Sequence, residues 1–405
     1  MSTDESESET MARDLPRDII IDILSRLPVR SLLRFKCVCK PWYALFKNPN
    51  FITKHFNQTT SHSTTNNKDN TCFLYTPRDS NTSNSNRSIS LLSNNETLNI
   101  PIDLDIPFLS ISKPFRISGS CNGLVCLSIV PLASIILLWN PATRVFKDLP
   151  ASPIARPQSL PIKVVLGFGF DQKTNDYRVL RIVYYCYPLN QVEMYSLSTN
   201  SWREIKADIR FLIFESSCSV FFKGRFHWTA VGFQELNGRE VIVSFDMDDE
   251  KLHYIMPPDF RSGDDGDCRF RWNLVVFKEC LGVIVCWDNG SNKKFDIWAM
   301  NEYGVTTSWT KYISFGPYPR INRPLSCGKD GEVLLERDRG ELVLYDPTTE
   351  TIKDLGAHGA VCWSDVFIHV ESLHPIKGGK VAEKSNLCAV LPDMNFVRKF
   401  DLVLE

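Results

Sequence analysis

The chain has 405 residues, 43% of them hydrophobic and 23% charged, and its formal net charge at pH 7 is -1. This length suffices for one large domain or two to three ordinary ones, and the near-neutral charge excludes a global field that would recruit nucleic acid or a membrane. Residues 2–10 carry four acids and no base, so we expect no secretory signal, which needs a basic region before an apolar one.

The cysteine content indicates the compartment. Thirteen cysteines, an odd number at irregular spacings, are typical of buried thiols under reducing conditions. We therefore expect the protein in the cytoplasm, the nucleus or both.

The first predicted element is an amphipathic helix within residues 15–51. Ile19, Ile23 and Leu27 recur one turn apart along one face of this helix, which Pro28 ends. A chain segment of fewer than forty residues cannot close a core of its own against the entropy of ordering it. This apolar face therefore needs a cover, either from the rest of the protein or from a partner.

Two further short helices are predicted in the same stretch. One carries residues 32–38, and the other begins near Pro41 and stops at residues 48–49. Residues 12–57 contain nine bases and three acids, and this excess of six positive charges favours an acidic partner surface. The side chains expected to hold the three helices together are Phe35, Val38 and Trp42.

Polar and apolar stretches alternate after these helices. Residues 57–71 read as a polar linker and residues 79–97 as a long polar loop. An apolar run between residues 117 and 143 imitates a membrane span, but its 120–141 portion aligns with residues 326–347, which are rich in charge. We therefore expect two short strands and a turn there instead of a membrane helix.

A repeat dominates the remaining sequence. Each copy is an apolar strand ending in an aromatic residue, a polar turn and a second strand, as in "LLWNPATRVFKDLP" and "VEMYSLSTNSWREI". In four of the five copies an apolar residue follows the aromatic after seven positions, while the fourth copy has an insertion that places Trp309 at plus eleven. The aromatics lie 56, 50, 53 and 47 residues apart and are Trp139, Tyr195, Phe245, Trp298 and Tyr345.

The repeat predicts a β-propeller. A second hairpin precedes each copy, usually with a turn at glycine, for which we assign Gly123, Gly224, Gly282 and Gly331. Four strands per unit and a period near fifty are those of a propeller blade, and single blades must stack into a ring to bury their faces. Five units are complete, and residues 72–77 together with residues 360–373 would supply a sixth. A pair of β-sandwiches is the structural alternative.

The opening stretch resembles the F-box, a match with intact spacing over about forty residues. The later sequence is similar to the F-box-associated, kelch-related domain of plant F-box proteins, through "SCNGLVCL", "LWNPATR", "GFGFDQKTNDYRVL" and "VEMYSLSTNSWREI". Within that family the chain resembles the S-locus-type and immunity-related group. The F-box resemblance is carried by Leu15-Pro16, Ile23-Leu24, Arg26-Leu27-Pro28, Leu32-Leu33, Arg34-Phe35, Val38-Cys39-Lys40, Trp42, Leu45 and Phe51.

The repeat and the resemblance together predict an α+β multidomain protein. Its parts would be a disordered acidic tail (1–11), a three-helix F-box (12–56), the linker (57–71), an all-β kelch-like propeller of six blades (72–373) and a C-terminal tail (374–405).

The resemblance implies a Skp1-like adaptor as partner, and through it cullin and RING subunits. An adaptor seated on the apolar helical face would supply its missing cover, and such an interface buries roughly 2,000 Å² or more. The alternative is a helical cap packed on the protein's own propeller. Matched to the family pattern, the adaptor contacts are expected to be Leu15, Pro16, Ile23, Leu27, Pro28 and Leu32.

The propeller would then hold a protein target. Loops between blades carry binding residues in such rings, so the candidates lie in residues 151–163, 207–217, 259–271 and 314–324. Aromatic and arginine side chains dominate binding energies at protein interfaces. The expected target contacts are Phe211, Phe214, Phe260, Arg261, Arg269, Tyr318 and Arg320.

Enzymatic functions fit the sequence less well, and we expect no catalytic residue, metal or cofactor. "GFGF" at residues 167–170 lies between strands, so it lacks the strand-to-helix setting of a nucleotide loop. The carboxylates of residues 262–268 match no calcium-loop register, and Cys37 and Cys39 lack a second pair at zinc spacing. A copper oxidase would require histidines and tyrosines to converge, and the seven histidines are scattered.

The predicted function is that of the substrate-recognition subunit of an SCF-type E3 ubiquitin ligase. The F-box would dock the adaptor and the propeller would bind the target protein for ubiquitination and degradation. A propeller scaffold that acts outside a ubiquitin ligase is the alternative.

Overall fold

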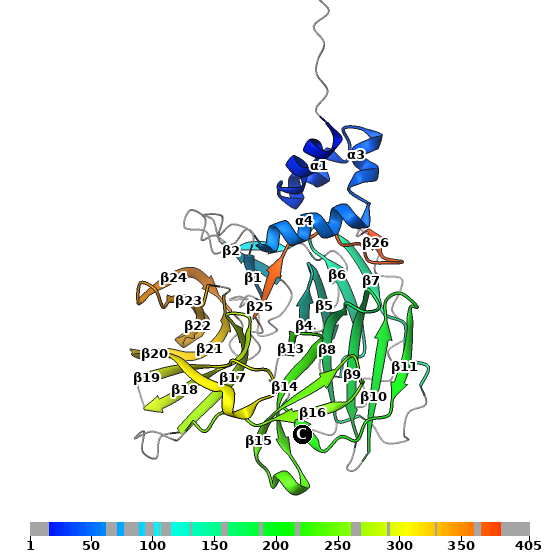
Figure 1. Cartoon of the computed structure of the whole chain (residues 1–405). Coiled ribbons are helices and arrows are strands. Elements are labelled where there is room, and N and C mark those ends of the chain that lie inside the picture. The colour runs from blue at the N-terminus through cyan, green and yellow to red at the C-terminus, as the bar shows by residue number, and fades with distance from the viewer. Residues whose placement is uncertain are drawn as a thin grey trace, which may run out of the picture. The chain divides into compact units, whose positions relative to one another are not determined.

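The computed structural model divides the chain into two compact units, residues 1–70 and 71–405 (Figure 1). The structure describes residues 16–61, 71–76, 89–93, 101–104, 106, 115–129, 132–154, 161–185, 189–214, 219–260, 269–289, 292–328, 330–359 and 366–381. The predicted acidic tail of residues 1–11 lies outside them.

The first unit contains four helices. They are α1 (Arg17–Ser25), α2 (Val29–Phe35), α3 (Lys40–Leu45) and α4 (Pro49–Ser61). A proline lies at the start of each of the first three helices. Pro16 and Pro28 are the N-cap residues of α1 and α2, and Pro41 lies in the first turn of α3. The prediction of three helices was wrong at this point, since Pro49 begins α4 instead of only ending α3. Residues 57–61 of the predicted linker are therefore helical.

A small core holds the four helices together. The rings of Phe35 and Trp42 lie 5.6 Å apart and those of Phe46 and Phe51 lie 5.4 Å apart, which confirms that Phe35 and Trp42 link the helices. Val38 does not join them, because its side chain is 62% exposed in the turn between α2 and α3. The buried apolar residues of this unit are Leu24, Val29, Leu32, Phe46, Phe51 and Ile52.

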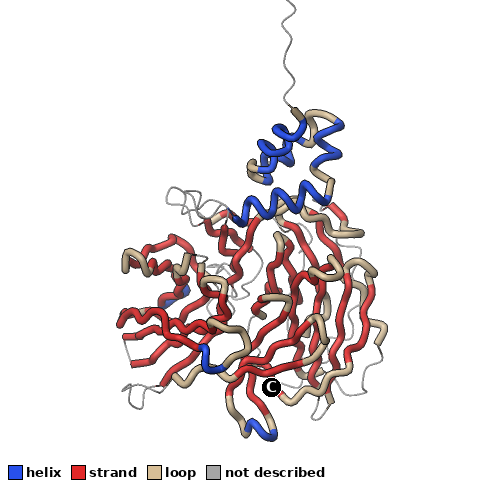
Figure 2. The backbone as a smooth tube through the Cα atoms, in the orientation of Figure 1, coloured by secondary structure: helices blue, strands red, loops and turns tan. Residues whose placement is uncertain are grey.

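The second unit is built from six antiparallel sheets among the described residues (Figure 2). Blade 1 contains β1 (Thr71–Tyr75), β2 (Ile89–Ser93), β3 (Ile102–Leu104) and, from the far end of the chain, β25 (Val366–Val370). Blade 2 contains β4 (Phe115–Cys121), β5 (Leu124–Ile129), β6 (Ile136–Asn140), β7 (Val145–Asp148) and β26 (Lys380–Val381). Blade 3 contains β8 (Lys163–Asp171), β9 (Asp176–Tyr184), β10 (Asn190–Ser196) and β11 (Ser201–Ile205).

The other three blades follow in chain order. Blade 4 contains β12 (Phe211–Ile213), β13 (Val220–Phe222), β14 (Arg225–Gly232), β15 (Glu240–Asp246) and β16 (Leu252–Ile255). Blade 5 contains β17 (Arg269–Phe277), β18 (Cys280–Asn289), β19 (Asn292–Met300) and β20 (Trp309–Pro319). Blade 6 contains β21 (Ile321–Cys327), β22 (Val333–Arg337), β23 (Glu341–Asp346) and β24 (Thr351–His358). Short 3-10 turns lie at Gln234–Leu236, Thr306–Ser308 and Asp338–Gly340.

The six sheets close into a ring, which confirms the six-bladed propeller and excludes two sandwiches. The innermost strands β25, β4, β8, β13, β17 and β21 each pack beside the next, and β21 returns to β25. One cluster of buried apolar side chains lies between each pair of neighbouring blades, so no blade buries its faces alone. The predicted sixth blade is confirmed by the pairing of β1 with β25.

Cross-strand pairing explains the repeat in the sequence. The aromatic and the apolar residue seven positions later are direct partners across the outer hairpin of a blade, as in Trp139 with Phe146 and Tyr195 with Trp202. The insertion in blade 5 shifts this register, so that Trp309 pairs with Met300 instead of Trp298. Each of the four regular turns has one residue in the left-handed region, with φ between 53° and 58°, at Arg144, Asn200, Glu250 and Glu350.

The "GFGF" motif serves blade packing. Gly167 and Gly169 lie on β8, where a Cβ at Gly167 would come within 2.9 Å of the Phe226 ring and one at Gly169 would collide with Phe221. Glycine therefore lets the aromatic rings of blade 4 approach the innermost strand of blade 3. Gly282 was wrongly assigned to a turn, because it lies within β18 and the turn before that strand is made by residues 278–279.

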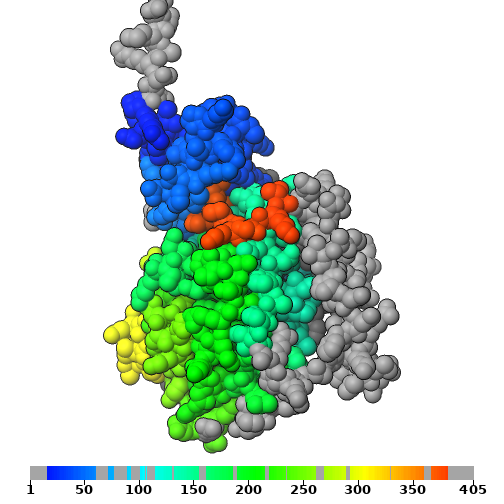
Figure 3. All heavy atoms as spheres, turned by 90° about the vertical axis from the view of Figure 1, so that its right-hand side faces the viewer, coloured from blue at the N-terminus to red at the C-terminus, as the bar shows by residue number. Residues whose placement is uncertain are grey.

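The C-terminal segment of residues 371–381, which we call the clasp, binds blade 2 from outside. Asn140 Nδ2 donates hydrogen bonds to the carbonyl oxygens of Ser372 (3.1 Å) and His374 (2.9 Å), and β26 pairs with β7. Figure 3 shows these residues as orange-red atoms on the surface beside the cyan atoms of blade 2. Residues 374–381 of the predicted C-terminal tail therefore pack on the propeller, whereas residues 382–405 lie outside the described chain.

The apolar stretch between residues 117 and 143 forms strands of blade 2, as expected. Among the described residues, no helix is both long enough and apolar enough to cross a membrane.

Candidate docking surfaces

The first helix exposes an apolar stripe. Ile19 and Ile23, one turn apart on α1, are 46% and 48% exposed. Pro16 and Pro28 at the two ends of α1 are exposed and Leu27 is half-buried. We call these residues, which lie on α1 and directly beside it, the α1 surface (Pro16, Ile19, Ile23, Leu27 and Pro28).

One predicted adaptor contact is buried. The Leu32 side chain has no exposed area, because it points from α2 into the core of the helical unit, so it cannot meet a partner on the surface. Leu15 lies outside the described residues. Ile19 was missing from the expected contacts, although its spacing of four residues from Ile23 would have identified it.

Leu27 is held in place by a buried histidine. His55 Nε2 on α4 donates a hydrogen bond to the Leu27 carbonyl oxygen at 2.9 Å, and burial lowers the pKa of His55. The neutral ring therefore ties α4 to the turn between α1 and α2, where the α1 surface ends.

The helical unit has few acids to balance its bases. Residues 16–61 contain eight Arg and Lys but only Asp18 and Asp22 as acids. The Asp22 carboxylate is 2.9 Å from Arg26 Nη2 and 3.3 Å from Lys54 Nζ, and hydrogen bonds from Lys54 and Arg26 hold its pKa below the ordinary value. Within residues 16–61 the bases therefore outnumber the acids by six.

The propeller has two faces with different connections. Since neighbouring strands are antiparallel, the turns after the first and third strands of a blade lie on one face, the turn face, and the other connections lie on the opposite loop face. Thr71 pairs with Val370 at the end of β25, and Val381 pairs with Val145 at the start of β7. The described chain therefore enters and leaves the propeller on the turn face, and the loop face is free of both ends.

Three predicted target contacts gather on the loop face of blade 5. Arg269, Asp288, Lys293 and Tyr318 are successive partners across β17, β18, β19 and β20, so they form one row at the ends of these strands. Arg320 follows as the single residue between β20 and β21, with its side chain 63% exposed. The predicted loop of residues 314–324 is thus two strand ends joined by Arg320.

The other predicted target contacts are not on a free surface. Phe211 is buried in the core between blades 3 and 4, and Phe260 is buried against Trp272, with ring centroids 6.1 Å apart. Neither ring is available on the surface, because Phe211 begins β12 and Phe260 lies in the loop after β16, and both side chains are buried. Phe214 is half-buried and its amide donates to the Thr229 carbonyl, while Arg261 lies outside the described residues.

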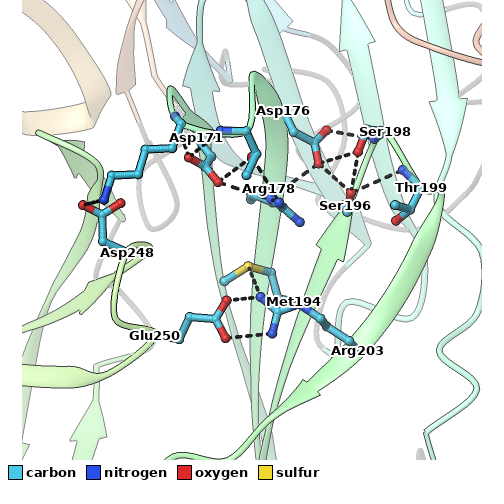
Figure 4. A network of polar contacts seen from close by, with 12 residues as sticks. Asp171, Asp176, Arg178, Met194, Ser196, Ser198, Thr199, Arg203, Asp248 and Glu250 are labelled. Carbon is cyan, nitrogen blue, oxygen red and sulfur yellow. Dashed lines mark hydrogen bonds and ion pairs between the residues drawn. The ribbon is translucent and has the colours of Figure 1, made fainter.

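A polar network on the turn face joins blade 3 to blade 4 (Figure 4). Arg203 Nη1 on β11 donates to Glu250 Oε2 at 2.8 Å, and Arg178 Nε lies 3.4 Å from Asp176 Oδ2. Burial of Asp171 opposes ionisation, but hydrogen bonds from Thr174 nevertheless hold its pKa below the ordinary value. The ion pairs Arg203–Glu250 and Lys173–Asp248 join the two blades, so the network stabilises the contact between them.

His227 of the propeller serves packing in the same way. His227 Nε2 lies 2.7 Å from the Tyr303 hydroxyl, and burial lowers the pKa of His227 to about 4. In the described part of the chain, no group of three or more His, Cys, Asp or Glu residues is placed to hold a metal ion. Cys37 and Cys39 are exposed free thiols beside Val38.

Comparisons with known proteins bear on both units. The family model of the F-box domain matches residues 13–54, and that of the F-box associated beta propeller domain matches residues 76–384. The chain is 31% identical to the F-box protein At3g07870 of Arabidopsis thaliana, over 89% of this chain and 91% of that protein.

Two further Arabidopsis thaliana relatives show the same pattern. The F-box protein CPR1 is 27% identical over 84% of both chains. The F-box/kelch-repeat protein At3g23880 is 29% identical over 85% of this chain and 91% of that protein.

Proposed function

The chain belongs to the family of F-box proteins that carry an F-box associated β-propeller domain, and from this premise we propose that it is the substrate-recognition subunit of an SCF-type E3 ubiquitin ligase. The helical unit binds a Skp1-like adaptor, which connects it to cullin and RING subunits. The propeller binds a protein target. The cytoplasm, the nucleus or both are the compartments that this role requires.

The α1 surface is the observation that carries the proposal. Ile19 and Ile23 leave almost half of their side-chain area in solvent, although the same unit buries six other apolar side chains. Burying one such isoleucine side chain contributes about 1.5–3 kcal/mol, which a partner gains when it covers this stripe. Asp22, which belongs to the same helix, is already paired within the unit, so the partner need not neutralise it.

The loop face of blade 5 is the region we propose for the target. Arg269, Tyr318 and Arg320 lie at the ends of paired strands, which hold their backbones in fixed positions. Arginine and tyrosine are enriched among residues that dominate binding energy. The subunit itself forms and breaks no bonds. It raises the local concentration of target lysines near a ubiquitin-charged enzyme, which is catalysis by proximity.

A binding measurement with a purified Skp1-like adaptor tests the proposal. Ile23→Asp in the full-length chain should weaken adaptor binding at least tenfold, because a carboxylate would be placed in an apolar interface. Ile162→Asp, at an exposed position of the propeller, is the matched control and should bind as the wild type does. Failure of the wild-type chain to bind the adaptor would instead support a propeller scaffold that acts outside a ubiquitin ligase.

A further inference from the structure

The second and third helices and the residues that directly follow them carry only positive charges. No acid occurs between Ile23 and Ser61, so every charged residue of α2, α3 and α4 is basic. Lys54 is paired with Asp22, but Lys36, Lys40 and Lys47 have no acidic partner among the residues that the structure describes.

The three lysines gather around one tyrosine. Lys47 Nζ donates to the Tyr43 hydroxyl at 2.5 Å and lies 4.1 Å from the centre of its ring. Burial lowers the pKa of Lys36, and the positive charge of Lys47 lowers it further. The two ammonium groups are therefore near enough to repel each other. Lys40 precedes Tyr43 by three residues on α3, on the same face of the helix. We call Lys36, Lys40, Tyr43 and Lys47 the lysine cluster.

The lysine cluster is destabilised by charge repulsion when no anion is bound to it. Two like charges held close together repel each other, and Tyr43 is 48% exposed, so the cluster presents charge and an apolar ring to solvent together. An acidic peptide segment fits such a surface, because carboxylates neutralise the lysines while its backbone packs on the ring.

A segment of that chemistry precedes the helical unit in the chain. Residues 4–9 contain Asp4, Glu5, Glu7 and Glu9 and no base. Seven residues separate Glu9 from Arg17, where α1 begins, and this length spans up to about 25 Å when extended. The longest helix of the unit, α4, has 13 residues and is about 20 Å long. The segment can therefore reach any side of the unit.

We propose that the acidic segment of residues 4–9 binds the lysine cluster of its own helical unit and competes there with acidic surfaces of the adaptor. The competition rests on the proposed function, whereas the contact itself does not. Exposed ion pairs contribute up to about 1 kcal/mol each, so three to four of them correspond to a dissociation constant of about 1–6 mM, which is comparable with the millimolar effective concentration that tethering provides. The contact is electrostatic and exposed, so it weakens as salt shortens the range of the charges.

Zero-length carbodiimide crosslinking of the full-length chain without adaptor tests the contact. At low salt, Asp4, Glu5, Glu7 or Glu9 should form amide bonds to Lys36, Lys40 or Lys47, and the yield should fall at 0.5 M salt. Lys54 is the internal control, because Asp22 already neutralises it. Crosslinks that join the segment to Lys54 as often as to the cluster, or none to the cluster, would overturn the proposal.

Adaptor affinity tests the competition through a charge series. Neutralising the segment (Asp4→Asn with Glu5→Gln, Glu7→Gln and Glu9→Gln) should tighten adaptor binding about threefold at low salt, and Ser6→Glu with Ser8→Glu should weaken it. Lys54→Gln, combined with the neutral segment, should leave the threefold gain in place. An affinity independent of segment charge would refute the competition. Loss of adaptor binding in every variant and in the wild type would refute the proposed function instead, while the crosslinks would still report on the segment.

Discussion

The two units treat their apolar and charged side chains in opposite ways. The propeller covers the apolar faces of its blades with its own chain, since each gap between blades is filled by one cluster of buried side chains. The helical unit leaves Ile19, Ile23, Val38 and Tyr43 exposed, and residues 16–61 contain eight bases but only two acids. The propeller therefore completes its core within its own chain. The helical unit, by contrast, has apolar and basic side chains that a partner could cover.

The largest expected effect comes from opening the ring. A chain that ends at residue 365 lacks β25, the innermost strand of blade 1, together with the clasp, and should lose cooperative unfolding of the propeller. A chain that ends at Val381 keeps both elements and should unfold like the full-length protein. Urea denaturation followed by tryptophan fluorescence compares the two. A cooperative transition in the shorter chain would show that the ring does not depend on its closure.

The next largest difference is expected when a buried side chain of the propeller and an exposed side chain of the helical unit are each truncated to alanine. Trp228 has no exposed area and donates a hydrogen bond from Nε1 to the Leu166 carbonyl, so Trp228→Ala should cost about 3–5 kcal/mol of unfolding free energy. Ile23→Ala, an apolar truncation on the α1 surface, should change it by less than about 0.5 kcal/mol. Equal costs at the two sites would contradict the idea that the helical unit keeps its exposed stripe for a partner.

A smaller effect is expected when a buried charge of the propeller is removed. The Asp296 carboxylate in blade 5 accepts hydrogen bonds from Trp287 Nε1 (2.8 Å) and Ser314 Oγ (2.6 Å) and pairs with Lys311 (3.2 Å). Asp296→Asn leaves that lysine without its acid and should cost about 2–3 kcal/mol in the same urea experiment. Asp22→Asn in the helical unit should leave the unfolding midpoint unchanged, because its ion pairs are exposed.

The smallest effect is a dependence on pH. Burial lowers the pKa of His227 and of His369 to about 4, from an ordinary value near 6.5. Between these values the unfolded chain binds more protons, so the propeller is fully stable above about pH 6.5 and loses stability as the pH falls towards 4. The slope is at most about 1.4 kcal/mol per pH unit for each histidine. His227→Gln should reduce the slope in urea midpoints measured from pH 7 to 4.5.

The ring was predictable because its signal is local. An aromatic and its partner seven residues later face each other across a tight turn, so the spacing in the sequence records a contact in space, as in Tyr195 and Trp202. The α1 stripe was predictable for the same reason, since helical periodicity places Ile19 and Ile23 on one face. The insertion in blade 5 changed the spacing between Trp298 and its counterpart, Trp309, from seven to eleven residues. The remaining strand pattern was still sufficient to recognise this blade.

The errors concern burial that depends on distant residues. Leu32 lies in the family pattern beside exposed positions, but the rings of Phe46 and Phe51 on later helices enclose the core into which it points. Phe211 and Phe260 occur in segments that the sequence predicts to be connections between blades, yet neighbouring sheets cover them. Only the packed structure distinguishes such residues from surface residues of the same type.

The position of β25 has a consequence for how the protein is made. Ribosomes deliver the chain from its N-terminus, and N-terminal elements generally fold first during synthesis. Among the described strands, β25 is the last one longer than two residues to leave the ribosome. The other five blades therefore form an open arc until translation is nearly finished. A message cut short near its end would therefore yield an open arc with two uncovered apolar sheet faces, which exposes the chain to quality control.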